Sequence, residues 1–178
     1  MDIKIPYTPR KHQKLLHQQI DKHRWSVLVC HRRFGKTVCM INHLIKSALM
    51  SKQKNPRFAY LAPTFKQAKS IAWDYMKQFT DKIPHTKFNE TELRVDLPNG
   101  ARITLLGSDS PDGLRGIYLD GCVIDEYANV NSRLFPEIIR PALSDRKGYC
   151  VFIGTPAGMN NNFYELYQHA NGADDWFN

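Results

Sequence analysis

Short apolar runs alternate with segments of helical period along most of the chain. The apolar runs have the length and aliphatic content of buried strands, and they lie at 26–30, 57–62, 121–125 and 148–154. The helical segments lie at 36–50, 64–80, 131–143 and 160–170. This alternation predicts an α/β fold in which helices cover a mainly parallel sheet.

A different pattern precedes the third strand-like run. Residues 92–107, "ELRVDLPNGARITLLG", hold two alternating runs around Pro98, Asn99 and Gly100. These residue types are typical of a tight turn, so we expect an antiparallel hairpin here. Because the chain has 178 residues and no repeat or internal linker, it is expected to form one domain over 1–178.

The charge balance suggests a polyanionic partner. Lys and Arg number 25 against 17 Asp and Glu, which leaves a net charge of +8. Residues 51–70 hold five basic residues and no acid. A solvated helix face would explain such a run as well as a nucleic-acid contact would.

The four cysteines show neither metal-binding nor disulfide spacing and are interpreted as small buried residues in a reducing compartment. The N-terminus lacks an apolar signal region, and no apolar run approaches the length of a membrane span. We therefore expect a cytosolic protein with no membrane partner.

Residues 30–37, "CHRRFGKT", match the phosphate-binding pattern G-x-x-x-x-G-K-[ST] at every fixed position except the first, which is Cys30. Gly35 lets the backbone approach a phosphate, and Lys36 reaches the outer phosphates. The hydroxyl of Thr37 can ligate Mg2+. A strand-like run before the loop and a helical period after it strengthen the prediction of an ATP site.

Arg32 and Arg33 add positive charge inside this loop. Surface charge at a strand-to-helix turn would explain them, and so would direct contact with the nucleotide. Phosphoryl transfer spreads negative charge over the γ-phosphate oxygens, and an arginine finger there can raise the rate roughly 10^3- to 10^5-fold. An arginine within the loop would act in its own subunit.

Two further strand ends carry polar residues. "GCVIDEYA" ends an apolar run on Asp125 and Glu126, where Asp125 could hold Mg2+ and Glu126 could deprotonate the attacking water. "VFIGTPAG" places Thr155 after another strand, where it could sense the γ-phosphate. Since ligands bind at the carboxyl ends of parallel strands, all three segments are expected at one sheet edge.

An upstream segment, "PYTPRKHQ", could reach the adenine. Tyr7, Arg10 and Gln13 are the candidates, because the amide of Gln13 offers both a donor and an acceptor to the base edge. A basic capping segment is the other interpretation.

Together, "CHRRFGKT", "GCVIDEYA", "GTP" and "PYTPRKHQ" resemble the N-terminal ATPase domain of the large terminase subunit, the DNA-packaging motor of tailed bacteriophages and related viruses. The resemblance runs from about Pro6 to Gly158. Its most specific feature is the loop, because this family carries arginine there and often lacks the leading glycine. It implies a three-layer P-loop NTPase of the additional-strand type, with a mainly parallel sheet and a β-hairpin insertion.

The same resemblance implies roles for individual residues. Arg32 would be the arginine acting within its own subunit, and Asp125 and Glu126 would be the Walker B pair. Thr155 would belong to the coupling motif. Arg115, in a Leu-Arg-Gly element, would be a finger that reaches a neighbouring subunit. The implied ATP-binding set is Arg10, Gln13, Arg33, Phe34, Gly35, Lys36 and Thr37, with residues 1–25 contributing to the adenine site and Thr37 and Asp125 holding Mg2+.

Members of the family usually add a C-terminal RNase H-like nuclease domain, which 178 residues cannot hold, so DNA cleavage is not expected. The implied partners are double-stranded DNA, a portal protein and a small terminase subunit. The implied assembly is a ring of identical subunits on the procapsid, in the cytoplasm of an infected bacterium, and the isolated domain can be monomeric.

Two other functions fit parts of the sequence. "LAPTFKQA" is similar to a segment of superfamily 2 helicases, although those proteins usually have small residues in place of Arg32 and Arg33 and Ser-Ala-Thr in place of residues 154–156. A nucleotide-regulated DNA-binding module without turnover is the second alternative, and a base at Glu126 argues against it.

Overall fold

The computed structural model of the chain describes residues 4–178. This part of the chain contains one eight-stranded sheet. The strands are β1 (Trp25–Val29), β2 (Arg57–Ala62), β3 (Lys87–Asn89), β4 (Arg94–Asp96), β5 (Arg102–Gly107), β6 (Gly121–Ile124), β7 (Tyr149–Gly154) and β8 (Trp176–Phe177). Their order is β3-β4-β5-β2-β6-β7-β1-β8. The four predicted core strands are present as β1, β2, β6 and β7.

Every pairing from β5 to β8 is parallel, whereas β3, β4 and β5 pair antiparallel. The predicted hairpin is therefore confirmed as β4 and β5, and β5 also continues the parallel sheet beside β2. Strand β7 lies between β1 and β6, which is the additional strand of the predicted fold class.

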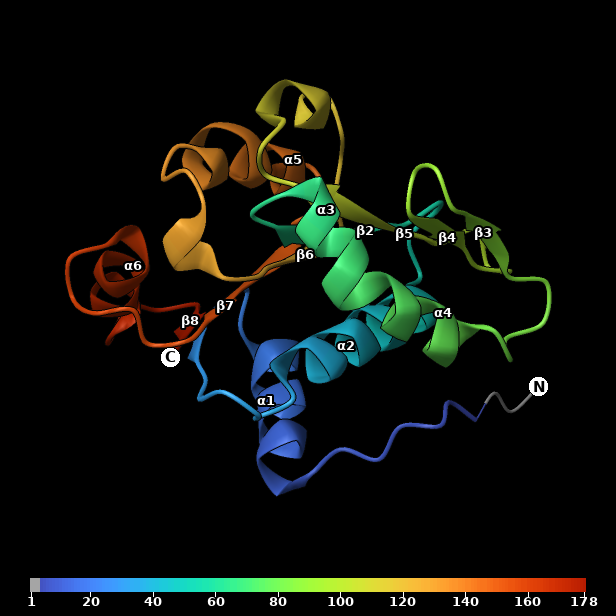
Figure 1. Cartoon of the computed structure of the whole chain (residues 1–178), viewed down its shortest axis with the longest axis horizontal. Coiled ribbons are helices and arrows are strands. Elements are labelled where there is room, and N and C mark those ends of the chain that lie inside the picture. The colour runs from blue at the N-terminus through green and yellow to red at the C-terminus, as the bar shows by residue number, and fades with distance from the viewer. Residues whose placement is uncertain (1–3) are drawn as a thin grey trace.

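Helices cover both faces of the sheet and make a three-layer structure (Figure 1). One face carries α1 (Lys11–Lys22), α2 (Lys36–Met50) and a continuous helical run of α3 (Phe65–Ala68), the π-helical turn η1 (Lys69–Trp73) and α4 (Asp74–Thr80). The other face carries η2 (Pro111–Leu114), η3 (Tyr127–Asn129), η4 (Phe135–Ile139), α5 (Arg140–Ser144) and α6 (Asn162–Ala170).

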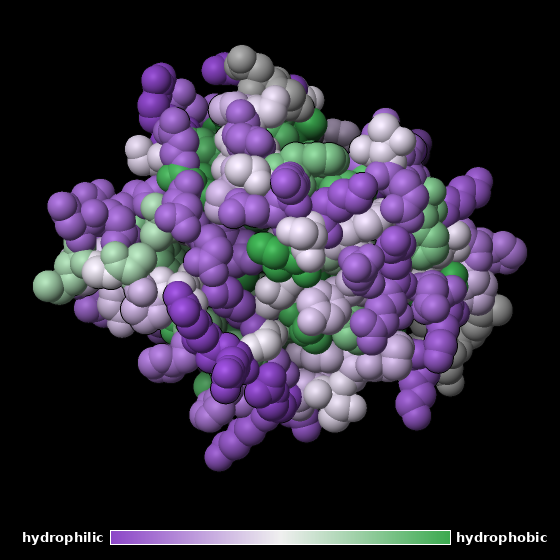
Figure 2. All heavy atoms as spheres, in the orientation of Figure 1, coloured by the Kyte–Doolittle hydropathy of each residue, from purple (hydrophilic) through white to green (hydrophobic). Residues whose placement is uncertain are grey.

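The strands supply side chains to two hydrophobic cores. In β2, Phe58 and Tyr60 join the core under α2 and α4, while Ala59 and Leu61 join the core under α5 and α6. Because successive side chains of a strand point to opposite faces, a strand buried on both sides must be apolar throughout. This requirement explains the continuous apolar runs in the sequence. The outer face shown in Figure 2 is mainly hydrophilic, with small hydrophobic areas between polar side chains.

The structure differs from the sequence-based expectation at several elements. Helix α1 has no counterpart among the predicted helices, because its buried positions are Gln13 and Ile20 and its face is therefore largely polar. The helix expected over 131–143 begins only at Phe135, with Pro136 in its first turn. The short strands β3 and β8 were also not predicted, since two or three residues carry no detectable period.

A partly buried chain of polar side chains links α1 to α2. The hydroxyl of Tyr7 lies 3.0 Å from His17 Nε2, and His17 Nδ1 lies 2.9 Å from His43 Nδ1. Burial is the main cause that lowers the pKa of His17, and it lowers the pKa of His43 to about 3. Both rings are therefore neutral near pH 7, with one donating its Nδ1 hydrogen to the other.

We expect acid to destabilise the protein through this pair. A histidine whose pKa is lower in the folded state contributes stability above its unfolded pKa of about 6.5 and loses it as pH falls. Between about pH 7.5 and pH 5 the loss from His43 amounts to about 2 kcal/mol. Urea unfolding of wild type and His43→Gln at both pH values measures it, and His12→Gln on the exposed side of α1 is the control. Equal pH dependence in wild type and His43→Gln would contradict the assignment.

Candidate functional site

The phosphate-binding loop connects the end of β1 to the start of α2. It contains two residues in the left-handed region, Arg33 with φ 66° and Gly35 with φ 79°. Helix α2 begins directly afterwards at Lys36, and the amide of Cys39 donates to the carbonyl of Gly35 at 3.0 Å. Free amides of a helix N-terminus behind a loop of this shape form a concave site for an anion.

Helix α1 supports the loop from outside. The amide nitrogen of Gln13 donates to the carbonyls of Phe34 and Gly35 at 3.2 and 3.3 Å, and the Gln13 oxygen accepts from the backbone of Arg10 at 2.9 Å. A Cβ atom on Gly35 would lie 2.6 Å from a guanidinium nitrogen of Arg10. The φ of Gly35 favours glycine, whereas the flexible end of the Arg10 side chain could move away from a Cβ atom.

Asp125 lies directly after β6 with 2% of its surface exposed. It accepts a short hydrogen bond from the hydroxyl of Tyr60 on β2 and a 2.8 Å bond from the amide of Glu126. Burial raises the pKa of this carboxyl, and the Tyr60 bond opposes the rise. Thr37, at the start of α2, lies beside the same Tyr60 hydroxyl. The Asp125 carboxylate and the Thr37 hydroxyl therefore lie beside the same Tyr60 hydroxyl.

Glu126 connects three of the predicted segments. Its Oε1 atom lies 2.6 Å from Lys36 Nζ, and its Oε2 atom accepts from the hydroxyl of Thr155 at 3.5 Å. Glu126 has φ 46° and ψ 49°, a left-handed conformation that disfavours residues with a side chain. Such backbone strain is typical of functional sites, where the surrounding structure holds an unfavourable conformation.

The structure brings most of the predicted site residues to the carboxyl edge of the parallel strands. Lys36, Thr37, Asp125, Glu126 and Thr155 meet there, and Arg10 and Gln13 lie against the loop from α1. The side chains of Arg32 and Arg33 are exposed on the loop, which also carries the half-buried Phe34.

Arg115 does not lie among the site residues at the carboxyl edge of the sheet. It lines a cavity of about 180 Å³ together with side chains from the segment 131–138. Among the described residues, none that lines this cavity belongs to the phosphate-binding loop, the acidic pair or the strand end at Thr155. Figure 1 shows the connection from β5 to β6 at the top of the view and the loop between β1 and α2 near the bottom.

Tyr60 is a site residue that the sequence analysis did not identify. It is fully buried in the middle of an apolar strand, where a tyrosine resembles any other core aromatic. Its hydroxyl meets Asp125 because β2 and β6 are parallel neighbours with Tyr60 opposite Val123. The proximity of Tyr60 to Asp125 can be recognised only once the strand order is known.

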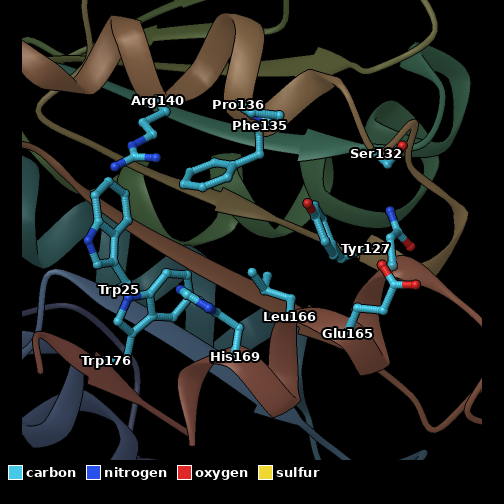
Figure 3. A pocket seen from close by; sticks show the side chains of 11 residues that line it. Trp25, Tyr127, Ser132, Phe135, Pro136, Arg140, Glu165, Leu166, His169 and Trp176 are labelled. Carbon is cyan, nitrogen blue, oxygen red and sulfur yellow. The ribbon is translucent and has the colours of Figure 1, made fainter. Parts of the chain in front are cut away.

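Two further cavities lie beside β1 and β8. One cavity, of about 450 Å³, lies between α1 and β8. It adjoins the phosphate-binding loop, and His31 and Phe34 are among the residues that line it. The other, of about 380 Å³, lies between α6 and η4, and Figure 3 shows the indole rings of Trp25 and Trp176 and the ring of Phe135 along its side. Sequence analysis assigned no role to the residues that line the second cavity.

Comparison with known proteins identifies the family of the chain. A family model described as "Terminase large subunit, T4likevirus-type, N-terminal" matches residues 29–175. The chain belongs to the terminase large subunit family. A curated relative, the large terminase subunit of Thermus phage G20c, is 30% identical over 126 residues, which is 60% of this chain and 26% of that protein. This terminase chain therefore spans about a quarter of the length of such relatives.

Solved terminase structures share its fold. The ATPase domain of the Thermus phage P74-26 large terminase superposes with a TM-score of 0.80 at 22% identity, covering 97% of this chain and 80% of that one. The large terminase of another thermophilic bacteriophage, solved in complex with ADP, gives a TM-score of 0.79 at 18% identity, covering 94% and 44%. These matches confirm the predicted P-loop NTPase fold.

The described residues contain neither a membrane-spanning helix nor a preformed cluster of metal-binding side chains. No helix in this part of the chain combines the length and apolar character needed to cross a membrane. Among the side chains that the structure describes, no three or more His, Cys, Asp or Glu cluster as a metal site.

The contacts of Gln13 lead to a prediction about nucleotide selectivity. If its amide chiefly holds the loop, Gln13→Ala should weaken ATP and GTP binding by the same factor, about 5- to 10-fold for the loss of one or two hydrogen bonds. Titration calorimetry with both nucleotides measures the factor, with Gln18→Ala on the exposed side of α1 as the control. A loss confined to ATP would instead support the adenine-reading role.

Proposed function

We propose that this chain is the ATP-hydrolysing motor domain of a viral terminase large subunit, which drives double-stranded DNA into a procapsid. The observation that carries the proposal is the contact of Lys36, Glu126 and Thr155 at the edge where three parallel strands end. In this family member the phosphate-binding cation and the candidate base are therefore already in one site.

Each site residue has its own role in the proposed hydrolysis of ATP. The loop amides and Lys36 bind the β- and γ-phosphates, for which Lys36 must leave Glu126. The freed carboxylate of Glu126 then orients the attacking water and takes its proton. Thr155 reports the state of the γ-phosphate through its contact with Glu126. Arg32 supplies positive charge to the γ-phosphate within the subunit, and Arg33, next to it in the loop, binds the nucleotide.

Thr37 and Asp125 fit a Mg2+ ion. One carboxylate and one hydroxyl at the base of a phosphate site are the ligands this ion accepts beside phosphate and water. Asp125 is buried and its charged form is disfavoured by burial, so a cation beside it would be stabilising. When bound between Thr37 and Asp125, Mg2+ would supply positive charge that offsets the charge of the phosphates.

The family also suggests the setting. We propose a ring of subunits on the procapsid portal in the host cytoplasm, with a portal protein and a small terminase subunit as partners and no nuclease activity in residues 1–178. The family match favours this assignment over the helicase alternative. The binding module without turnover is separated from it by the hydrolysis experiment below.

Basic residues of the run 51–70 fall into two groups in space. Lys52, Lys54 and Arg57 lie at the strand-start edge, before or at the beginning of β2. Lys66 and Lys69 follow the end of β2 and lie at the edge that carries the nucleotide site, about 20 Å away along six strand residues. We propose that Lys66 and Lys69 contact the DNA backbone. A DNA contact at the edge that carries the nucleotide site can respond directly to ATP hydrolysis, as a translocating motor requires.

Substitution of the site residues tests hydrolysis. Lys36→Ala should abolish ATP binding, because the phosphates lose their cation. Glu126→Gln should bind ATP at least as tightly as wild type, because Lys36 is no longer paired, while kcat falls roughly 10^2- to 10^4-fold. ATP binding and phosphate release measure both, with the exposed Glu137→Gln as control. Wild-type turnover in Glu126→Gln would refute the base assignment and favour another general base.

DNA affinity should depend on salt and on Lys66 and Lys69. Binding to duplexes of unrelated sequence should be equally tight, and removal of two phosphate contacts should reduce the slope of log K against log salt by about 2. Fluorescence anisotropy of Lys66→Ala/Lys69→Ala measures this, with Lys52→Ala/Lys54→Ala as the matched pair. A reduced slope in the control pair alone would transfer the contact to the opposite edge.

Action of Arg115 across a subunit interface is testable by mixing. Arg115→Ala should still bind ATP but hydrolyse it roughly 10^3-fold more slowly or worse. Mixed with Lys36→Ala, it should recover turnover, because intact Lys36 sites would meet intact Arg115 neighbours. Arg133→Ala, which alters a neighbouring exposed arginine of the same cavity, should be neutral. Absence of recovery in verified mixed assemblies would contradict action in trans.

A further inference from the structure

The connection that carries Arg115 crosses the molecule from one sheet edge to the other. It leaves the end of β5 at the nucleotide edge and enters β6 at the opposite edge. Leu114 and Leu119 are both buried in the core under α5, with 4% and 3% exposure. Arg115 and Gly116 between them are exposed, and Gly116 has φ 78°. Arg115 therefore lies on a short arch between two buried leucines.

Tyr118 fixes the far end of this arch. Its hydroxyl donates to the carbonyl of Asn55 at 3.0 Å. The Arg146 guanidinium carbon lies 4.5 Å from the centre of the ring, and that of Arg57 lies 5.9 Å from it. Guanidinium groups at these distances attract the face of an aromatic ring.

The two arginines are themselves fixed to the backbone. Arg57 donates through Nη1 to the carbonyls of Pro56 and Gly100 at 3.1 and 3.0 Å. Arg146 donates through Nη1 to the carbonyl of Lys54 at 3.1 Å. The ring of Tyr118 thus contacts groups that the start of β2 and the β4–β5 turn hold in place, at the edge away from the nucleotide site.

Open space next to the arch makes this fixation important. A cavity of about 270 Å³ lies between Gly116 and Ile117 on one side and Ala59 and Leu106 of the sheet on the other. Arg115, which precedes Gly116 in the chain, lines the separate cavity of about 180 Å³. Because cavities leave atoms without packing partners, the arch can shift at low cost unless its ends are held.

We propose that Tyr118, held by Arg57 and Arg146, is the positioning residue that sets where Arg115 reaches. This proposal rests on the finger role of Arg115 put forward above. A finger stabilises developing charge only when its guanidinium is correctly placed, and a displacement of about 1 Å can cost roughly 100-fold in rate. Release of Tyr118 should therefore slow hydrolysis without weakening nucleotide binding.

The test compares Tyr118→Ala with Tyr118→Phe in assembled protein, by steady-state ATP hydrolysis. Tyr118→Phe keeps the ring between the arginines and should retain kcat within about 3-fold, while Tyr118→Ala should lower kcat roughly 10- to 100-fold with KM unchanged. Tyr118→Ala/Arg115→Ala should be no slower than Arg115→Ala, because both changes disable one group. Tyr75→Ala, an exposed tyrosine on α4, is the matched control.

Mixing separates positioning from simple destabilisation. Tyr118→Ala mixed with Lys36→Ala should recover turnover, since a misplaced finger affects only the neighbour's site. Unchanged kcat in folded Tyr118→Ala, or equal loss in Tyr118→Phe, would overturn the proposal, as would a further rate loss in the double variant. If Arg115→Ala itself hydrolyses at the wild-type rate, the finger role fails first; if Arg115→Ala is slow and Tyr118→Ala is not, only the positioning role fails.

Discussion

The ion pair between Lys36 and Glu126 is the interaction on which the arrangement of the site depends. It joins Lys36, which follows β1, to Glu126, which follows β6, although β7 lies between these two strands in the sheet. The contact is possible because β1, β7 and β6 are parallel neighbours, with Val29 opposite Gly154 and Ile124 opposite Phe152. The ends of all three strands therefore reach the same edge. The strained backbone of Glu126, which costs of order 1–3 kcal/mol, keeps its carboxylate directed at the loop.

The pair has a consequence for the proposed ATPase function. In the structure the charges of Lys36 and Glu126 neutralise each other. In the proposed mechanism, phosphate competes with Glu126 for Lys36, and success in that competition releases the base. That mechanism makes nucleotide binding and activation of the base a single event. Residues around the pair support it: Gln13 holds the loop from α1, and Tyr60 holds Asp125 from β2.

The sequence predicted those parts of the site that are local in the chain. A loop between an apolar strand and a helix, and acids at a strand end, are recognisable because backbone amides and strand ends impose them on adjacent residues. Tyr60, Tyr118 and the His17–His43 pair could not be found this way, because each acquires its role from a partner on another element. Helix α1 was missed for a related reason: its buried face is completed by Gln13, whose burial depends on loop carbonyls rather than on hydrophobic packing.

A crystal structure of the chain with Mg2+ and a non-hydrolysable ATP analogue would test the central claim most directly. The account predicts that Lys36 Nζ moves to within about 3 Å of a β- or γ-phosphate oxygen and separates from Glu126, whose carboxylate then faces the γ-phosphate. It also predicts that Thr37 and Asp125 lie around the ion. A structure in which the Lys36–Glu126 pair persists while the analogue occupies another cavity, such as the one between α6 and η4, would contradict it.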